Sequence, residues 1–152
     1  MQALQSNASD LSGVAQGDAF KIDEVNLFER LGKEVFVKLS TNFYNRVYAD
    51  SEQWFVDIFA GKPKEASIQN QYEFFIQRMG GPALYSERKG HPALIGRHME
   101  FNISKQSAER WIEIMEKAMD DTPEIDPDSR MRMMNFLKHT AYFIYLGVNR
   151  NK

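Results

Sequence analysis

Apolar residues recur at intervals of three and four along most of this 152-residue chain. Leu39, Phe43 and Val47 fall on one face of a helix, and the same spacing returns around Trp111 and Met115. Repeats close to 3.6 residues are typical of amphipathic α-helices, whereas half-buried strands alternate with a period of two. No segment shows the alternating pattern, and no internal repeat is present. The sequence therefore predicts an all-α fold.

Caps and breakers mark where the predicted helices begin and end. Asp23 or Asn26 can cap a first short helix that stops near Gly32, and Asp50 or Ser51 can cap a third. We expect a loop at 83–91 and a loosely ordered extension at 1–22, ahead of one domain at 23–150. Further signals are Pro63 in a first helical turn, Gly80-Gly81-Pro82 at the end of that helix, Pro92 at the start of a very short helix, Ser104 as an N-cap, Asp126-Pro127 at the start of the last helix and Gly147 at its end.

Composition narrows the class of protein. A net charge of −2 gives no electrostatic footprint for nucleic acid or for an anionic membrane surface. No apolar run is long enough to span a bilayer, and residues 1–5 lack the basic end and apolar core of a signal peptide. The absence of cysteine fits a reducing compartment. We therefore expect a soluble, intracellular, cytoplasmic protein that binds neither nucleic acid nor membrane.

Metal chemistry in this chain must use histidine or carboxylate ligands, because there is no cysteine and hence no thiolate. The chain has three histidines. His139 falls off the main apolar stripe of the last helix, so we expect it to be structural and partly exposed. His91 lies between Gly90 and Pro92, where a cap or hydrogen-bonding role is expected. His98 is the remaining candidate.

His98 ends the short helix that Pro92 begins, with Leu94 and Ile95 one turn before it and Phe101 after it. One histidine cannot hold zinc, which takes three or four protein ligands. It can hold a haem iron, because the porphyrin supplies the other four nitrogens. Two interpretations stay open on these grounds, a haem ligand and an ordinary core histidine. The aromatic content of 12% suits an aromatic core and also walls around a flat apolar cofactor.

A set of motifs, taken in order, resembles a known family. The motifs are Phe43-Tyr44 in the second helix, Phe59 before a break, Gly80-Gly81-Pro82 with Tyr85-Ser86, Gly90-His91-Pro92, Arg97-His98 with Phe101, and Trp111. Their order and spacing are similar to those of the truncated haemoglobins of the second class, and residues 68–101 are most similar to the plant members. The resemblance covers about residues 24–148. It implies a globin-like, truncated two-over-two helical sandwich around haem b.

The resemblance also implies roles for single residues. His98 would be the proximal ligand of the haem iron. Tyr44, Gln71 and Trp111 would occupy three distal positions, and Ser67 would stand where conventional globins place a distal histidine. The residues expected to contact the haem are Phe59, which would stack against the porphyrin, Phe74, Phe75, Met79, Tyr85, Ile95, Arg97, Phe101, Ile103 and Met115.

The haem propionates need cations or hydroxyl groups as partners. Arg97 and Tyr85 are the first candidates, and Arg88 and Lys89 are weaker ones. Some bacterial members carry an arginine at the position that corresponds to Asn70, so this chain departs from them at that contact.

The distal residues carry hydrogen-bond donors. Dioxygen bound to ferrous iron is partly negative at its outer atom, and hydroxyl, indole and amide N–H groups stabilise that charge. Ser67 is too short to reach the iron, which leaves the sixth position of a pentacoordinate iron open to dioxygen, carbon monoxide or nitric oxide. Several donors together predict slow dioxygen release.

The resemblance implies gas binding with nitric oxide or peroxide detoxification, as an NO dioxygenase or a weak peroxidase. Turnover would need an external reductase or reductant, because 152 residues leave no room for a reductase domain. Oxygen storage or transport and gas sensing are alternatives without turnover. An all-α interaction module without haem belongs to a different class and predicts a colourless protein with a replaceable His98. Phe143 and Leu146 are apolar positions that could hold a homodimer together.

Overall fold

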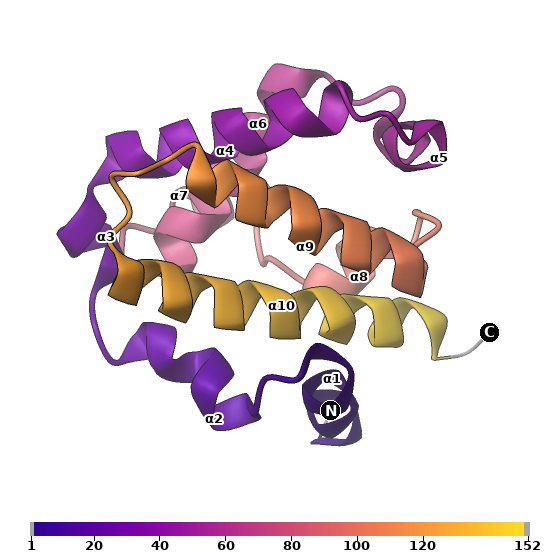
Figure 1. Ribbon diagram of the computed structural model, residues 1–152, viewed down its shortest axis with the longest axis horizontal. Helices are drawn as coiled ribbons and strands as arrows, with labels where there is room; N and C mark the ends of the chain where they lie inside the picture. Colours follow the sequence, from indigo (N-terminus) through magenta and orange to yellow (C-terminus); the bar gives the residue numbers. More distant parts are fainter. Residues whose placement is uncertain (1, 151–152) are drawn as a thin grey trace.

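The computed structural model describes residues 2–150, which contain ten α-helices, two short 3₁₀ helices and no strand (Figure 1). The predicted all-α fold is confirmed. No helix in this range is long and apolar enough to cross a membrane. The elements are α1 (Gln2–Ser12), α2 (Gln16–Ala19), η1 (Phe20–Asp23), α3 (Leu27–Leu31), α4 (Lys33–Tyr48), α5 (Gln53–Val56), η2 (Asp57–Phe59), α6 (Lys64–Arg78), α7 (Leu84–Lys89), α8 (Leu94–His98), α9 (Lys105–Asp120) and α10 (Pro127–Asn149).

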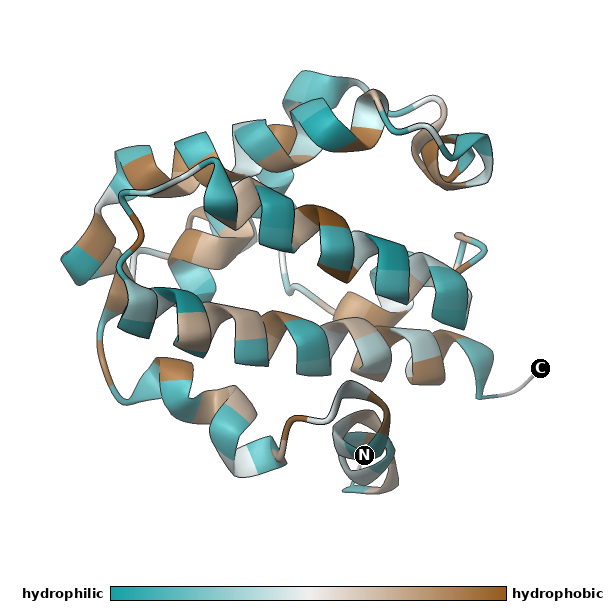
Figure 2. Cartoon of the chain, in the orientation of Figure 1, coloured by the Kyte–Doolittle hydropathy of each residue, from teal (hydrophilic) through white to brown (hydrophobic). Residues whose placement is uncertain are grey.

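The four longest helices form two layers. α4 packs against α6, and α9 packs against α10, while α4 also touches α9 across the layers (Figure 1). Each helix turns one apolar face inward, so that Phe43 of α4, Ile76 of α6 and Met115 of α9 are fully buried in one core. Hydrophilic residues alternate with hydrophobic ones around α9 and α10, as expected for helices with one buried face (Figure 2). This is the expected two-over-two sandwich.

Side-chain caps begin three helices where the sequence predicted them. Asn26 Oδ1 accepts a hydrogen bond from the Glu29 N–H at 2.8 Å at the start of α3. Ser104 Oγ accepts from the Ser107 N–H at 3.0 Å, and the Ser104 N–H donates to the Ser107 hydroxyl at 2.8 Å. Asp126 caps α10 in the same way. These local signals place the starts of α3, α9 and α10.

The segment 83–91 is not the expected loop, because α7 occupies most of it. Six residues are too few to be helical alone. Gln77 of α6 holds this helix, since its Nε2 donates to the Ser86 hydroxyl at 2.7 Å and its Oε1 accepts from the Ser86 N–H at 2.8 Å. The helix is therefore stabilised by a tertiary contact, which the local sequence pattern does not predict.

The N-terminal extension is helical, which corrects the expectation of a loosely ordered segment. α1, α2 and η1 all pack against α10, and Figure 1 shows α1 and α2 below that helix. Ala8 is fully buried beside Tyr142 in a small separate cluster. Much of the contact surface of α1 consists of small and polar side chains, so apolar periodicity in the sequence does not mark it.

α1 also covers side chains of α10 that the sequence placed at the surface. His139 is buried, not partly exposed, and its Nε2 lies 3.2 Å from the Ser9 hydroxyl. Burial lowers the pKa of His139, which favours the uncharged ring in this apolar place. Phe143 and Leu146, the positions suggested for a dimer, are partly buried against the same cluster.

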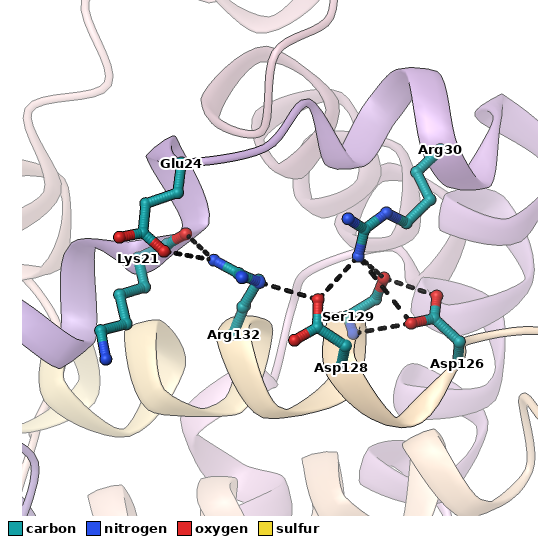
Figure 3. A network of polar contacts seen from close by, with 7 residues as sticks. All are labelled: Lys21, Glu24, Arg30, Asp126, Asp128, Ser129 and Arg132. Carbon is teal, nitrogen blue, oxygen red and sulfur yellow. Dashed lines mark hydrogen bonds and ion pairs between the residues drawn. The ribbon is translucent and has the colours of Figure 1, made fainter.

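Charged residues fasten η1 and α3 to the start of α10 (Figure 3). Arg132 donates to the Lys21 carbonyl and to Glu24 Oε1, both at 2.8 Å, and its Nε donates to Asp128 at 2.9 Å. Arg30 donates to the same Asp128 oxygen at 2.9 Å. Exposed ion pairs contribute little singly, but this network joins three elements. The N-terminal segment is thus attached to α10 in two ways, by burial at α1 and by exposed ion pairs at η1 and α3.

The sequence predicts that the last helix ends at Gly147. In the structure α10 continues to Asn149, so this prediction is wrong. At Gly147 the helix touches α8, because a Cβ atom there would lie 2.3 Å from Cδ1 and 2.6 Å from Cγ1 of Ile95. Such distances are far below van der Waals contact. The glycine therefore permits close approach of α8 and is not a helix stop.

A carboxylate links the end of α4 to α9. Asp50 does not cap the third predicted helix, since α5 begins at Gln53 without a side-chain cap. The Asp50 side chain is 7% exposed and is bonded by Arg110, whose Nε lies 3.1 Å from Oδ2 and whose Nη2 contacts Oδ1. These hydrogen bonds hold the pKa of Asp50 below its usual value. The pair fixes the part of α9 that carries Trp111.

Asp50→Asn should remove a stabilisation that depends on pH. Because the folded-state pKa of Asp50 is lowered, its contribution is complete above the unfolded-state pKa of about 3.9 and is lost as the pH falls through the folded value. Chemical denaturation of both proteins, from about pH 7 to about pH 3, measures the difference in unfolding free energy. Asp10→Asn, in the exposed part of α1, is the matched control. A wild-type advantage that stays constant with pH would contradict the prediction.

Candidate functional site

A cavity of about 710 Å³ is walled by helices of both layers, α4, α6, α8, α9 and α10. This volume is typical of cofactor and ligand sites, and most of the wall is aromatic or aliphatic. Most of the residues that the sequence singled out line it, namely Tyr44, Phe59, Ser67, Gln71, Phe74, Phe75, Tyr85, Arg97, His98, Phe101, Ile103 and Trp111. Segments far apart in the chain thus meet around one space.

His98 supplies this cavity with an imidazole in a defined state. Its Nδ1 lies 2.6 Å from the carbonyl oxygen of Leu94, one turn earlier in α8, so Nδ1 carries the proton and donates it. The lone pair then belongs to Nε2. Burial lowers the pKa of His98, which also favours the uncharged ring. A neutral imidazole with one free nitrogen is the form that binds a metal.

α8, which carries His98, has five residues and no side-chain cap. The chain enters it at Ala93 with a φ of 40°, in the left-handed region that is costly for a residue with a Cβ atom. Two contacts hold this entry. The Ala93 N–H donates to His91 Nδ1 at 2.9 Å, and the Arg97 guanidinium donates to the His91 carbonyl at 2.8 and 3.1 Å. The expected hydrogen-bonding role of His91 is confirmed.

Three polar side chains reach the same cavity from three helices, Tyr44 from α4, Gln71 from α6 and Trp111 from α9. Burial raises the pKa of Tyr44, so its hydroxyl stays protonated and can donate. Gln71 Oε1 is buried and has no hydrogen-bond partner among the described residues. An amide left in this way costs free energy unless a ligand bonds to it. The cavity wall therefore contains polar groups in need of a partner.

Tyr44 and Trp111 carry polar groups and also pack in the aromatic core. The rings of Tyr44 and Trp111 lie against Phe43, with centroids 4.9 and 5.0 Å apart. Each ring therefore belongs to the aromatic core while its residue also lines the cavity. The two roles that the sequence left as alternatives are compatible here.

Ser67 lines the cavity, but its hydroxyl is engaged within the protein. Its Oγ lies 3.2 Å from the Tyr48 hydroxyl, which donates to the Lys62 carbonyl at 2.8 Å. Tyr48 thereby ties the first turn of α6 to the segment that precedes it. Ser67 offers the cavity little more than a small side chain.

Charged side chains lie around the rim of the cavity. Lys62, Lys89 and Arg97 all line it. The Lys62 ammonium lies 3.3 Å from Glu100 and 5.3 Å from the centre of the Phe101 ring. Arg97 donates to the backbone carbonyls of Lys89 and His91, so Arg97 and Lys62 both already have partners within the protein. Lys62 follows the break at Gly61, and no sequence signal marked it.

Arg88 of α7, a weaker candidate for the propionates, bonds to a residue of the cavity wall. Its guanidinium donates to Asn70 Oδ1 at 2.7 Å and to Glu73 Oε1 at 2.8 Å. Asn70 lines the cavity. Arg88 does not line the cavity itself, and its charge is paired with Glu73.

Three of the predicted contact residues lie outside the cavity wall. Met79 and Met115 are buried in the main hydrophobic core, where helix packs on helix. Ile95 lies against Gly147 of α10. Their contact with a bound cofactor stays a prediction.

α10 contributes a wall that the sequence analysis did not identify. Phe136, Thr140 and Ile144 line the cavity and follow one another at intervals of four. That spacing is the signal that was available. One face of α10 therefore packs in the main core, and another forms part of the cavity wall.

These residues fit a haem. Aromatic walls suit its flat apolar ring, rim cations suit its carboxylates, and the one neutral imidazole suits its iron. In residues 2–150, no group of three or more histidine, aspartate or glutamate side chains is placed to hold a metal ion by itself.

Comparison with known proteins agrees with this geometry. The family described as bacterial-like globin matches residues 26–143. The chain is 61% identical over 147 residues to the two-on-two hemoglobin-3 of Arabidopsis thaliana, with 97% of this chain and 84% of that protein covered. It is 57% identical over 148 residues to the group 2 truncated hemoglobin 3-1 of Lotus japonicus, with 97% and 88% covered.

A solved structure shares the fold. The truncated oxygen-avid haemoglobin of Bacillus subtilis superposes with a TM-score of 0.69 at 33% identity, over 77% of this chain and 96% of that one. Globins of this kind carry haem b, so the cofactor expected from the sequence is confirmed. The chain therefore belongs to the bacterial-like globin family, alongside the group 2 truncated haemoglobins of plants and bacteria.

Proposed function

We propose that the protein binds dioxygen, carbon monoxide and nitric oxide at a pentacoordinate haem b iron whose one protein ligand is His98. Haem-based gas binding follows from membership of the globin family. Bound haem supplies an iron atom with a coordination position for a small gas. The observation that carries the proposal is that Tyr44, Gln71 and Trp111, which all carry hydrogen-bond donors, line the cavity of His98.

The polar groups of this cavity favour a ligand that carries partial negative charge. The Tyr44 hydroxyl is protonated, and a glutamine amide can turn its N–H₂ toward the ligand. Each donor contributes about 0.5–1.5 kcal/mol net, and more to a charged partner. Release of dioxygen should therefore be slow. The similar haemoglobin of Bacillus subtilis, described as oxygen-avid, supports this expectation.

Slow release suits retention and chemistry better than delivery. We therefore place nitric oxide or peroxide detoxification first, with an external reductase or reductant as the source of electrons. Oxygen storage or transport comes second, because a carrier must let its ligand go, and gas sensing third. Nitrate formation from nitric oxide added to the reduced protein under air, with and without reductant, tests the turnover.

Substitution of the three donors tests the gas-binding site. Tyr44→Phe, Gln71→Leu and Trp111→Phe should each speed dioxygen dissociation from the reduced protein by about two- to tenfold, because each removes one hydrogen bond of about 0.5–1.5 kcal/mol. Stopped-flow mixing of the oxygenated protein with carbon monoxide measures the rate. The Soret band should shift on addition of either gas.

Matched controls lie on α6 outside the cavity. Tyr72→Phe removes a hydroxyl and Gln69→Leu removes an amide, and neither residue lines the cavity. Both should keep the wild-type rate. Wild-type rates in all three site variants would show that the donors are misassigned, and a reduced protein whose spectrum ignores both gases would overturn the function itself.

A further inference from the structure

A second cavity, of about 430 Å³, lies between the N-terminal extension and the globin domain. Gln5 of α1 and Phe20 of η1 line one side, and residues of α6, α8 and α10 line the other. The family match begins only at residue 26, so part of this wall lies outside the region that defines the family. The size is that of a small-molecule site.

The wall of this second cavity is mainly aromatic. Phe20, Phe74, Phe136 and Phe143 all line it, and so do Leu94 and Ile95 of α8. Phenyl rings favour a flat apolar guest, since stacked and edge-on ring contacts add to the gain from burial. A purely polar or highly charged guest would lose its hydration here without compensation.

One polar atom in this wall lacks a partner. Gln5 Oε1 is buried and has no hydrogen-bond partner, a state shared in residues 2–150 by two other side-chain atoms, Ser40 Oγ and Gln71 Oε1. Gln71 lines the haem cavity in the same way that Gln5 lines the second. A buried carbonyl oxygen of this kind favours a guest with a hydrogen-bond donor.

Three other polar residues of the wall already have hydrogen-bond partners, and Thr140 lines both cavities. Arg78 donates to both carboxylate oxygens of Asp23, at 2.6 and 3.2 Å. His139 contacts the Ser9 hydroxyl, and His91 accepts the Ala93 N–H. Gln5 is therefore the polar residue with a buried, unpartnered oxygen that lines the second cavity alone.

We propose that this second cavity binds a small aromatic molecule that carries one N–H or O–H donor, such as an indole or a phenol. The ring lies among the phenyl groups, and the donor bonds to Gln5 Oε1. This site goes beyond gas binding, and its existence does not depend on the proposed function.

The site also communicates with His98. Leu94 lines both cavities, and its carbonyl oxygen is the partner of His98 Nδ1 at 2.6 Å. A guest against Leu94 therefore bears on the residue that orients the imidazole. This second part rests on His98 being the iron ligand, and it predicts that the guest changes the spectrum of the haem.

Calorimetric titration of the full-length, haem-loaded protein tests the site, with indole as the probe and benzofuran as its isostere without a donor. Indole should bind at one site and more tightly than benzofuran. Gln5→Leu should weaken indole by about three- to tenfold, the worth of one hydrogen bond, and leave benzofuran unchanged. Gln2→Leu, the same substitution at an exposed position of α1, should bind both as wild type does.

Two further variants and one spectrum locate the guest. Gln71→Leu should leave indole binding unchanged, because Gln71 lines only the haem cavity. Loss of indole binding in Gln71→Leu but not in Gln5→Leu would place the guest at the haem and overturn the proposal, as would no binding to the wild type.

Indole should shift the Soret band of the wild type at the concentrations that saturate the calorimetric site. Calorimetric binding of indole with an unchanged Soret band would overturn the link to His98. The proposed site and the proposed gas binding would both stand. Phe143→Trp, which enlarges a side chain of the second cavity only, should weaken both probes.

Discussion

His98→Ala protein is expected to purify with little or no haem. The substitution removes the one imidazole that lines the large cavity, and no other histidine of the described residues lines it. Apolar contacts with the porphyrin remain, but the bond to the iron is lost, and rim cations alone hold a haem loosely. The ratio of Soret absorbance to protein absorbance, measured after purification and after addition of haemin, gives the occupancy.

The fold should survive this change, so the result can be interpreted. His98 is only half-buried and lies at the end of α8, away from the main core. Circular dichroism should therefore show a helical apoprotein. Gln106→Ala is the control, since it truncates an exposed side chain of α9 outside the haem cavity and should leave haem content normal. Normal haem content with an unchanged spectrum in His98→Ala would rule out the proximal role.

Gly147→Val should destabilise the protein and displace α8. A Cβ atom at this position meets Cδ1, Cγ1 and Cγ2 of Ile95 at 2.3, 2.6 and 3.0 Å, so either α8 or α10 must move. Valine is a better helix former than glycine by a few tenths of a kcal/mol, but overpacking of this kind costs about 1–3 kcal/mol, and steric conflict wins. Denaturant unfolding measures the loss, and the haem spectrum reports the displacement of His98.

Two companion variants isolate the cause. Gly17→Val makes the same change in α2, where a Cβ atom has no neighbour within 4 Å, and should cost far less. Ile95→Ala removes the side chain that collides, so in Gly147→Val it should restore much of the stability and the wild-type spectrum. A double-mutant cycle gives the coupling energy, which should be about 1 kcal/mol or more. Simple additivity would mean that the two residues do not compete for space.

The sequence was sufficient where structure depends on near neighbours. Helical periodicity located the core of the four long helices, and Asn26, Ser104 and Asp126 fixed the starts of three helices within a residue. These contacts span three or four positions along the chain, which a pattern can detect. The motif order also brought most of the site residues together correctly.

The sequence was insufficient where structure depends on distant partners. α7 exists because Gln77 bonds to Ser86, and α1 is ordered because small side chains such as Ala8 fit against α10. Gly147 looked like a helix stop because local rules assign glycine that role, yet its partner Ile95 lies 52 positions away. The prediction for His139 was wrong for the same reason, since its partner Ser9, in the helix that covers it, lies 130 positions earlier in the chain.

The shortness of α8 has a consequence for how the apoprotein behaves. A helix of five residues, entered through a left-handed Ala93, cannot hold its shape by its own hydrogen bonds. Its order depends on the hydrogen bonds of His91 and Arg97 at its entry, on its contact with Gly147 of α10 and on the contents of the large cavity. We therefore expect local unfolding of α8 in the apoprotein to oppose binding of the cofactor, so that part of the binding free energy is used to fold this segment.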